Sequence, residues 1–234
     1  MNFTDTPLGK INQGKDFVFF FGNAQADLET LKIKFPALQF ARLKQTHSDI
    51  VVASDHPTEN QVIGDAHFTD QAGLALVSVT ADCVPILIYD QGQKRIAAVH
   101  AGWRGVAQRI LPKTISALLN LGSHSQDLIL ALGPHIQFQS FEVGTDVKEQ
   151  ILASVMTVKP NHFLDLSQGK ARVNLLGVLQ SQLDEMQISK KQCWCSHEDT
   201  FKNLSLHSFR RDRDLAGRQC SFIQLTSVGT ERPL

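Results

Sequence analysis

The sequence predicts a single domain in which α-helices and β-strands are mixed, of the α/β or α+β class. Its 234 residues can bury a substantial core, although length alone would allow one large domain or two small ones. Apolar runs of strand length alternate with segments of helical periodicity along the chain. No linker, internal repeat or low-complexity tract divides it, so one domain is favoured over two.

Short apolar runs bounded by turn residues indicate the strands. The first run is rich in phenylalanine and stops at Gly22-Asn23. Another, at 74–79, is expected to be buried and leads directly into a motif with candidate functional residues. The expected strands are residues 15–22, 40–44, 50–52, 74–79, 85–89, 95–99, 128–132, 205–213 and 221–225.

Apolar residues that recur every three or four positions indicate the helices. Pro36 should stop the first helix, and Pro112 should kink or restart the second. A third begins at the Phe141–Gly144 motif, and the fourth is a well-formed amphipathic segment. The expected helices are residues 24–34, 106–119, 141–154 and 174–187.

The overall charge excludes a protein that attracts nucleic acid or anionic membranes as a whole. Lys plus Arg and Asp plus Glu both number 23, so any anion site must come from a local basic cluster. The N-terminus has no signal-peptide pattern, and the apolar run 18–21 is too short to span a membrane. Four cysteines without framework spacing indicate reduced thiols or ligands. We expect a cytoplasmic protein, a monomer or weak homo-oligomer, with no nucleic-acid or membrane partner.

A predicted β-hairpin brings together a thiol and an imidazole. The apolar runs 85–89 and 95–99 flank a turn signal, and Gln91-Gly92 fits a two-residue loop. Asp90 would then face Gln93, and Cys83 would lie directly opposite His100. Opposed residues have Cβ atoms about 4.5–5.5 Å apart, close enough to share a metal ion or a proton.

A second histidine converts this pair into a candidate metal site. His47 follows a polar Gln-Thr pair at the start of an apolar strand, and with Cys83 and His100 it completes a His₂Cys set. Three protein ligands with an open fourth position are typical of catalytic zinc. Asp65 and Asp82 are candidates to hydrogen-bond the ligands. A buried structural role for Cys83 and a thiol–imidazole dyad remain alternatives.

Local clusters suggest where an anion could bind. Gly102 and Gly105 flank Trp103-Arg104 at the start of a predicted helix, whose backbone N–H groups and Arg104 could hold phosphate. The basic cluster Arg210–Arg213 with Arg218 is equally consistent with a surface turn and with substrate-anion binding. Cys193 and Cys195, in Cys-Trp-Cys-Ser-His, are one residue short of a C-x₂-C knuckle, so packing is favoured over a second metal.

Six motifs, in order between about residue 42 and residue 225, resemble the YfiH family. This family has been labelled polyphenol oxidase or laccase-like, and later purine nucleoside phosphorylase with adenosine deaminase activity. The first 40 residues depart from the usual start of the family, which carries a Gly-Gly motif. The motifs are Gln45-Thr46-His47, Asp65-Ala66-x-x-Thr69, Thr80-Ala81-Asp82-Cys83-x-Pro85, His100-Ala101-Gly102-Trp103-Arg104-Gly105, Gly133-Pro134 with Phe141–Gly144, and Ser208-Phe209-Arg210 with Gly217-Arg218.

The resemblance implies one α+β domain over residues 1–234, a four-layer α/β/β/α sandwich with mixed sheets. It is similar to the deamidase domain of cytotoxic necrotizing factor toxins. It also implies that His47, Cys83 and His100 are the zinc-binding catalytic set. The implied reaction is phosphorolysis of adenosine, inosine, guanosine or methylthioadenosine to base and ribose 1-phosphate, with adenosine deamination as a second activity. Phosphate would lie near Arg104 and Arg210, with Arg218 as a further candidate.

Three other functions are weighed against this one. A laccase needs several coppers held by many histidines, whereas this chain has no His-x-His pair, so zinc is favoured over copper. A cysteine hydrolase or deamidase would use Cys83 as nucleophile and His100 as base. A non-catalytic, metal-stabilised module for a protein partner is the third. In the deaminase variant, zinc would activate water for attack on C6, with Asp82 or Asp65 handling protons.

Overall fold

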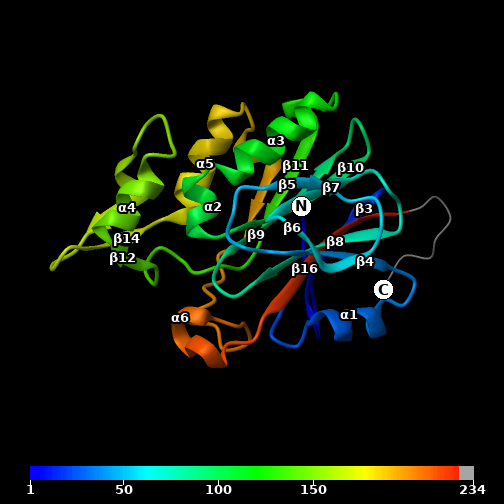
Figure 1. The fold of residues 1–234 in the computed structure, drawn as a ribbon, viewed down its shortest axis with the longest axis horizontal. Coiled ribbons are helices and arrows are strands. Elements are labelled where there is room, and N and C mark those ends of the chain that lie inside the picture. The colour runs from blue at the N-terminus through cyan, green and yellow to red at the C-terminus, as the bar shows by residue number, and fades with distance from the viewer. Residues whose placement is uncertain (227–234) are drawn as a thin grey trace.

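Two mixed β-sheets lie face to face at the centre of the protein, and helices cover their outer faces (Figure 1). The structure is a computed structural model that describes residues 1–226. One sheet, here sheet A, combines antiparallel pairs with two parallel pairs around β4. In order across sheet A the strands are β1 (Thr4–Thr6), β2 (Gly9–Gln13), β3 (Phe17–Gly22), β16 (Gln219–Leu225), β8 (Leu74–Thr80), β4 (Gln39–Lys44) and β6 (Thr58–Ile63).

The opposing sheet, sheet B, carries the predicted hairpin at its centre and has parallel pairs at both edges. Its strands, in spatial order, are β15 (Cys193–Cys195), β11 (Leu128–Leu132), β9 (Val84–Asp90), β10 (Arg95–Ala101), β7 (Ala66–Thr69) and β5 (Val51–Ala53). A small antiparallel sheet lies to one side of the sandwich, together with α4 (Figure 1). It consists of β12 (Glu142–Gly144), β14 (Lys170–Val173) and β13 (Phe163–Asp165).

The helices lie outside the sheets. Helices α3 and α5 cover sheet B, and α1 covers sheet A (Figure 1). The described α-helices are α1 (Leu28–Lys34), α2 (Trp103–Ala107), α3 (Ile110–Asn120), α4 (Thr145–Leu152), α5 (Leu175–Glu185) and α6 (Phe209–Asp212). Single 3₁₀ turns are η1 (Ser125–Asp127), η2 (Pro160–His162), η3 (Lys190–Gln192) and η4 (Arg213–Leu215). No helix among the described residues is both long and apolar enough to cross a membrane.

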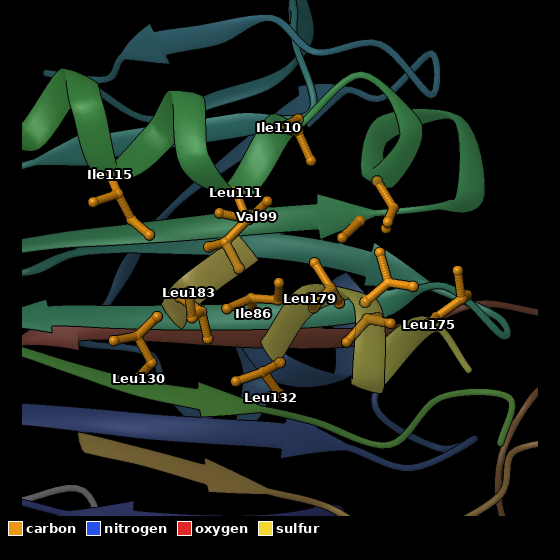
Figure 2. Packing of buried hydrophobic residues seen from close by; sticks show 14 of the residues in the cluster. Ile86, Val99, Ile110, Leu111, Ile115, Leu130, Leu132, Leu175, Leu179 and Leu183 are labelled. Atoms are coloured by element: carbon orange, nitrogen blue, oxygen red, sulfur yellow. The ribbon is translucent and has the colours of Figure 1, made fainter. Parts of the chain in front are cut away.

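Three separate apolar layers follow from the alternation of side chains along the strands. Phe20 packs with Leu31 of α1 on the outside of sheet A, whereas its neighbour Phe19 packs with Leu87 between the sheets. On the outside of sheet B, strand residues such as Ile86 meet the side chains of α3 and α5 (Figure 2). Three interlayer cores require four layers, so the predicted α/β/β/α sandwich is confirmed.

The predicted hairpin forms, but its register is wrong by two residues. The loop has four residues, 91–94, so Asp90 pairs with Arg95 and His100 pairs with Pro85. The physical reason is that Asp90 Oδ1 accepts hydrogen bonds from the backbone of Gly92 and Gln93, which favours a wider turn. Cys83 therefore does not face His100 across the ladder, and it lies in the turn before β9.

Several predicted boundaries also shift. The helix expected at 24–34 begins at Leu28, because the Asp27 side chain caps it by accepting from the N–H of Thr30. The helix expected at 106–119 is two helices, interrupted at Arg109, whose φ is 62°. The second restarts at Ile110, which places Pro112 in the first turn, where proline is tolerated.

Two predictions of element type are wrong. The motif 141–144 opens with strand β12, and its helix begins only at Thr145. Residues 205–213 form a turn and the short helix α6 in place of a strand. Here the Ser208 side chain accepts from the N–H of Arg211 and caps that helix, so local hydrogen bonding outweighs the apolar pattern.

Prediction. Leu31→Ala should lower the free energy of unfolding by about 2–5 kcal/mol, because the Leu31 side chain is fully buried between α1 and sheet A. Ile33→Ala, on the same helix but 82% exposed, should change it by no more than about 0.5 kcal/mol. Urea denaturation of both variants is the measurement. Equal effects would contradict the packing of α1 on sheet A.

Candidate functional site

The predicted ligand residues meet at one end of the sandwich. His47 lies in the loop after β4, Cys83 lies in the turn between β8 and β9, and His100 lies near the end of β10. Their ligand atoms all lie within 4.8 Å of one another. Among residues 1–226, they form the one such group of three or more His, Cys, Asp or Glu residues. The structure therefore brings together, from separate segments, the set that the sequence singled out.

Asp65 connects both histidines through a network of hydrogen bonds. Its Oδ1 accepts from His100 Nδ1 at 2.8 Å and from the His47 backbone N–H at 3.0 Å. Its Oδ2 accepts from the backbone N–H groups of Thr46 (3.1 Å) and Ser48 (2.7 Å) and from the Ser48 hydroxyl (2.6 Å). One buried carboxylate thus positions one ligand by its ring and the other by its backbone.

The charge of Asp65 is stabilised in spite of its burial. Burial alone would raise its pKa, but the hydrogen bonds from His100 and Ser48 outweigh this effect and lower it strongly. Asp65 is therefore an acceptor only, and His100 donates from Nδ1. This tautomer leaves Nε2 of His100 free as a metal ligand.

The loop that carries His47 is held in an unusual conformation. His47 has φ of 60°, in the left-handed region, where its N–H and those of its neighbours converge on Asp65. Just before it, the Gln45 side chain donates to the Val79 carbonyl and accepts from the Val79 N–H, both at 2.8 Å. The Gln45 side chain thereby extends the pairing of β4 with β8, and this fixes the start of the loop that carries His47.

Gly102 has no side chain, and this leaves room for the ligand side chains. A Cβ placed on Gly102 would lie 2.8 Å from Cδ2 of His47 and 3.1 Å from Sγ of Cys83. Any other residue would push these two side chains apart. The glycine of the His-Ala-Gly-Trp-Arg-Gly motif is thus required by the close approach of the ligand side chains.

The donor set fits a tetrahedral metal ion. His47 Nε2 and Cys83 Sγ are 3.9 Å apart, close to the roughly 3.6 Å expected between N and S ligands on tetrahedral zinc. A thiolate with two imidazoles is also within the range of copper, so the ligands alone leave the metal's identity open. The side of the set that faces the pocket supplies no fourth side-chain ligand among the described residues, which is the pattern of a catalytic site.

The pKa values of the metal-free cluster move in the direction that metal binding requires for the thiol. Burial would raise the pKa of Cys83, but the charge and hydrogen bonds of His100 and His47 lower it. Burial would lower the pKa of His100, but the Cys83 thiolate and the hydrogen bond to Asp65 raise it. The thiolate, the form that binds metal, is therefore favoured near neutral pH.

A pocket of about 660 Å³ opens beside the three ligands. Its walls combine apolar side chains, including Ile136, Phe141 and Leu175, with many cationic ones. The predicted anion-binding residues Arg104, Arg210 and Arg218 line it, as does Arg213 of the same basic cluster, whereas Arg42 and Lys44 were missed. The cations are Arg42, Lys44, Arg104, Arg210, Arg213 and Arg218. Arg42 and Lys44 alternate just before the Gln-Thr-His motif, and this spacing is the signal that could have found them.

Two predicted roles change. Helix α2 has only five residues, so its N-terminus lacks the aligned peptide dipoles of a longer helix, which leaves Arg104 on the pocket wall as the candidate group for an anion there. Asp82 does not hydrogen-bond a ligand. Its carboxylate accepts from the Thr200 hydroxyl and from the Arg210 N–H, both at 2.6 Å, which fastens the α6 segment beside the pocket.

The Cys-Trp-Cys-Ser-His stretch lies away from this pocket. Cys193 and Cys195 are on β15 at the edge of sheet B, and both pack partly against the core beneath α5. Burial raises the pKa of each thiol. These features agree with the packing role that the sequence favoured.

Comparison with known proteins places the chain in a family. The family described as "multi-copper polyphenol oxidoreductase laccase" matches residues 23–226. The chain belongs to this family, the YfiH family. A protein of Clostridium acetobutylicum named purine nucleoside phosphorylase is 31% identical over 198 residues, which cover 84% of this chain and 81% of the relative. A Deinococcus radiodurans protein of the same name is 33% identical, with 82% and 72% covered.

Solved structures of other YfiH-family proteins share the fold. YlmD of Geobacillus stearothermophilus superposes with a TM-score of 0.87 at 20% identity, covering 96% of this chain and 99% of that one. The YfiH protein of Bacillus licheniformis gives 0.85 at 23% identity with the same coverage. These likenesses confirm the architecture of the chain.

Prediction. Asp65→Asn should weaken zinc binding by about 10- to 100-fold, because an amide presents one acceptor and two donors to groups that all donate. Competition with a chromophoric chelator measures the affinity, and circular dichroism verifies that the variant is folded. Asp70→Asn, an exposed acid at the end of β7, is the matched control. A folded Asp65→Asn variant with wild-type affinity would contradict the positioning role.

Prediction. In metal-free protein, alkylation of Cys83 by iodoacetamide should reach its maximal rate well below pH 8.5, the pKa of an ordinary thiol, because a lowered pKa leaves more thiolate at a given pH. Cys195, whose pKa is raised, should react only at higher pH and serves as the internal control. Peptide mass spectrometry separates the two sites. Identical pH profiles would show that the histidines do not stabilise the thiolate.

Proposed function

We propose that this protein is a zinc-dependent purine nucleoside phosphorylase, which transfers the ribose of adenosine, inosine, guanosine or methylthioadenosine to phosphate. The observation that carries the proposal is the three-ligand set with an open side, facing a pocket that has both cationic and apolar walls. The relatives named purine nucleoside phosphorylase, at about 30% identity, support it. Bound to His47, Cys83 and His100, zinc would supply a Lewis acid beside the reacting groups.

Different residues of the pocket would bind the phosphate and the purine. Arg104 is two residues after Gly102, whose missing Cβ leaves room for two ligand side chains, and the Arg210 backbone N–H donates to Asp82, the neighbour of Cys83. Their guanidinium groups would hold phosphate next to the metal set. The apolar wall, which includes Phe141 and Leu175, would cover the faces of a purine. The flanking helices and strands keep these groups in place before substrate arrives.

The reaction needs little covalent help from the protein. A phosphate oxygen forms a bond to C1′ of the ribose as the bond from C1′ to N9 breaks. The purine leaves with the bonding electron pair and takes up a proton, which gives free base and ribose 1-phosphate. Positive charge from Arg104 and Arg210 keeps the phosphate oriented for this attack.

Adenosine deamination is the second activity that we propose for the same pocket. Water would then attack C6 of the purine, and the bond from C6 to the exocyclic nitrogen would break, so that ammonia leaves and inosine is formed. Of the two acids considered for proton transfer, Asp65 is fully buried and committed to five hydrogen bonds. Asp82 lines the pocket, so proton transfer falls to Asp82.

Three rival functions can be separated from this proposal. A multicopper oxidase needs several metal sites, whereas the described part of the chain contains one suitable group of ligands. A cysteine hydrolase is favoured by the lowered pKa of Cys83, and it would act without metal. Persistence of activity in excess chelator, with a covalent adduct on Cys83, would identify the hydrolase. A folded His47→Ala variant that loses activity would exclude a purely metal-stabilised binding module.

Prediction. Zinc-loaded protein should release base from adenosine or inosine only when phosphate is present, and ammonia from adenosine with or without phosphate. Cys83→Ala should lower both rates by at least about 100-fold, because it removes a ligand of the metal set. Cys193→Ala, a thiol outside the pocket, is the matched control. Chromatography of the bases is the measurement. If the rates of Cys83→Ala match those of the wild type, or if the wild type releases neither base nor ammonia, the proposal fails.

A further inference from the structure

The pocket holds more positive charge than one phosphate can neutralise. None of its six cationic side chains forms a salt bridge within residues 1–226, although the chain as a whole has a formal net charge of +0. Outside the pocket, Arg109 is paired with Glu185 and Arg211 with Asp212. The one acid that lines the pocket among described residues is Asp82, whose oxygens already accept two hydrogen bonds. Bound phosphate carries about two negative charges, which leaves several guanidinium groups without a partner.

Strand register separates these cations into two groups. Arg104 is four residues after the ligand His100, and the backbone N–H of Arg210 donates to Asp82, the neighbour of Cys83. Arg42 pairs with Val77 across the parallel β4–β8 ladder, so Lys44, two residues on, shares its face and lies level with Val79. Val77 and Val79 belong to the core beneath α1, so both cations project from the outer face of sheet A.

Arg218 reaches the pocket from the loop before β16, the strand next to β8. It immediately precedes Gln219, which pairs with Thr80, and it is two residues from Cys220, which also belongs to the core beneath α1. Arg218 lies just before the first residue of β16 and lines the same pocket as Arg42 and Lys44. Its guanidinium donates to the carbonyls of Ala216 and Gly217 within its own loop and lies 5.9 Å from the centre of the Phe209 ring. Arg42, Lys44 and Arg218 therefore form a distal cation group, with Arg213 on the pocket wall nearby.

An unsatisfied donor within the distal group points to a ligand. Arg42 Nε is buried and has no hydrogen-bond partner. A buried donor left unpaired costs free energy, and a guanidinium is especially costly because it keeps its charge. Next to β4, β6 bulges, and Asn60 in that bulge, with φ of 62°, also lines the pocket. The distal group thus has the composition of an anion site, with a fork of donors and an amide.

The distal group and the metal set line one pocket. Arg218 comes just before Gln219, which pairs with Thr80 at the end of β8, and Cys83 lies in the turn that follows Thr80. We propose that the pocket takes purine nucleoside 5′-monophosphates, with the 5′-phosphate held by Arg42, Lys44 and Arg218. This substrate class rests on the proposed phosphorolysis at the metal set. The same attack of phosphate on C1′ then releases the base and gives ribose 1,5-bisphosphate.

The test compares the binding of AMP and adenosine to zinc-loaded protein by isothermal titration calorimetry, in buffer without phosphate. AMP should bind at least about tenfold more tightly, because the 5′-phosphate gains charge-assisted hydrogen bonds. In Arg42→Gln and in Lys44→Gln this affinity ratio should fall several-fold toward one. Lys191→Gln, an exposed lysine on η3 outside the pocket, is the control and should keep the ratio.

Three outcomes would overturn the proposal. Equal affinities for AMP and adenosine would show that no 5′-phosphate site exists. A preference for AMP that is lost in Arg104→Gln but kept in Arg42→Gln and Lys44→Gln would place the phosphate beside the metal set. Adenosine with saturating inorganic phosphate that binds as tightly as AMP would assign the distal group to free phosphate.

Assays of turnover distinguish this proposal from the proposed function. If adenosine and inosine are phosphorolysed while AMP shows no binding preference, the function stands and the 5′-phosphate site fails. If AMP is preferred and the preference depends on Arg42 and Lys44, but no base is released, the site stands and phosphorolysis fails.

Discussion

The buried carboxylate of Asp65 is the constraint on which the rest of the site depends. It holds the imidazole of His100 and three successive backbone N–H groups of the His47 loop. Because these donors come from the segment after β4 and from β10, the carboxylate joins the end of sheet A to sheet B. Its cost of burial is offset by five hydrogen bonds, so it serves as a fixed anchor. Gly102, which has no side chain, lets the side chains of His47 and Cys83 approach one another.

The apolar runs and helical periodicities predicted one domain of mixed helices and strands, and the resemblance to the YfiH family implied its four layers. The sequence also singled out His47, Cys83 and His100, since motif resemblance does not depend on knowing how segments pack. The pairing of Cys83 with His100 across a hairpin was wrong, because the carboxylate of Asp90 widens the turn. The cations Arg42 and Lys44 were missed, because a strand residue reveals its face only when its neighbours and register are known.

The family carries two names, and the residues of this chain favour one chemistry. A description as a multicopper laccase implies several copper sites, whereas the described residues offer a single group with one thiolate and two imidazoles. The cationic pocket beside that group suits an oxyanion, and its apolar wall suits a planar base. Charge and shape therefore agree with the relatives named purine nucleoside phosphorylase.

The most direct test of this account is the metal content and coordination of the purified, zinc-loaded protein. Elemental analysis with X-ray absorption spectroscopy should find one zinc per chain, with one sulfur ligand at about 2.3 Å and two imidazole nitrogens at about 2.0–2.1 Å. Cys83→Ala should remove the sulfur contribution. Two or more metal ions per chain, or a zinc shell without sulfur, would contradict a single site formed by His47, Cys83 and His100.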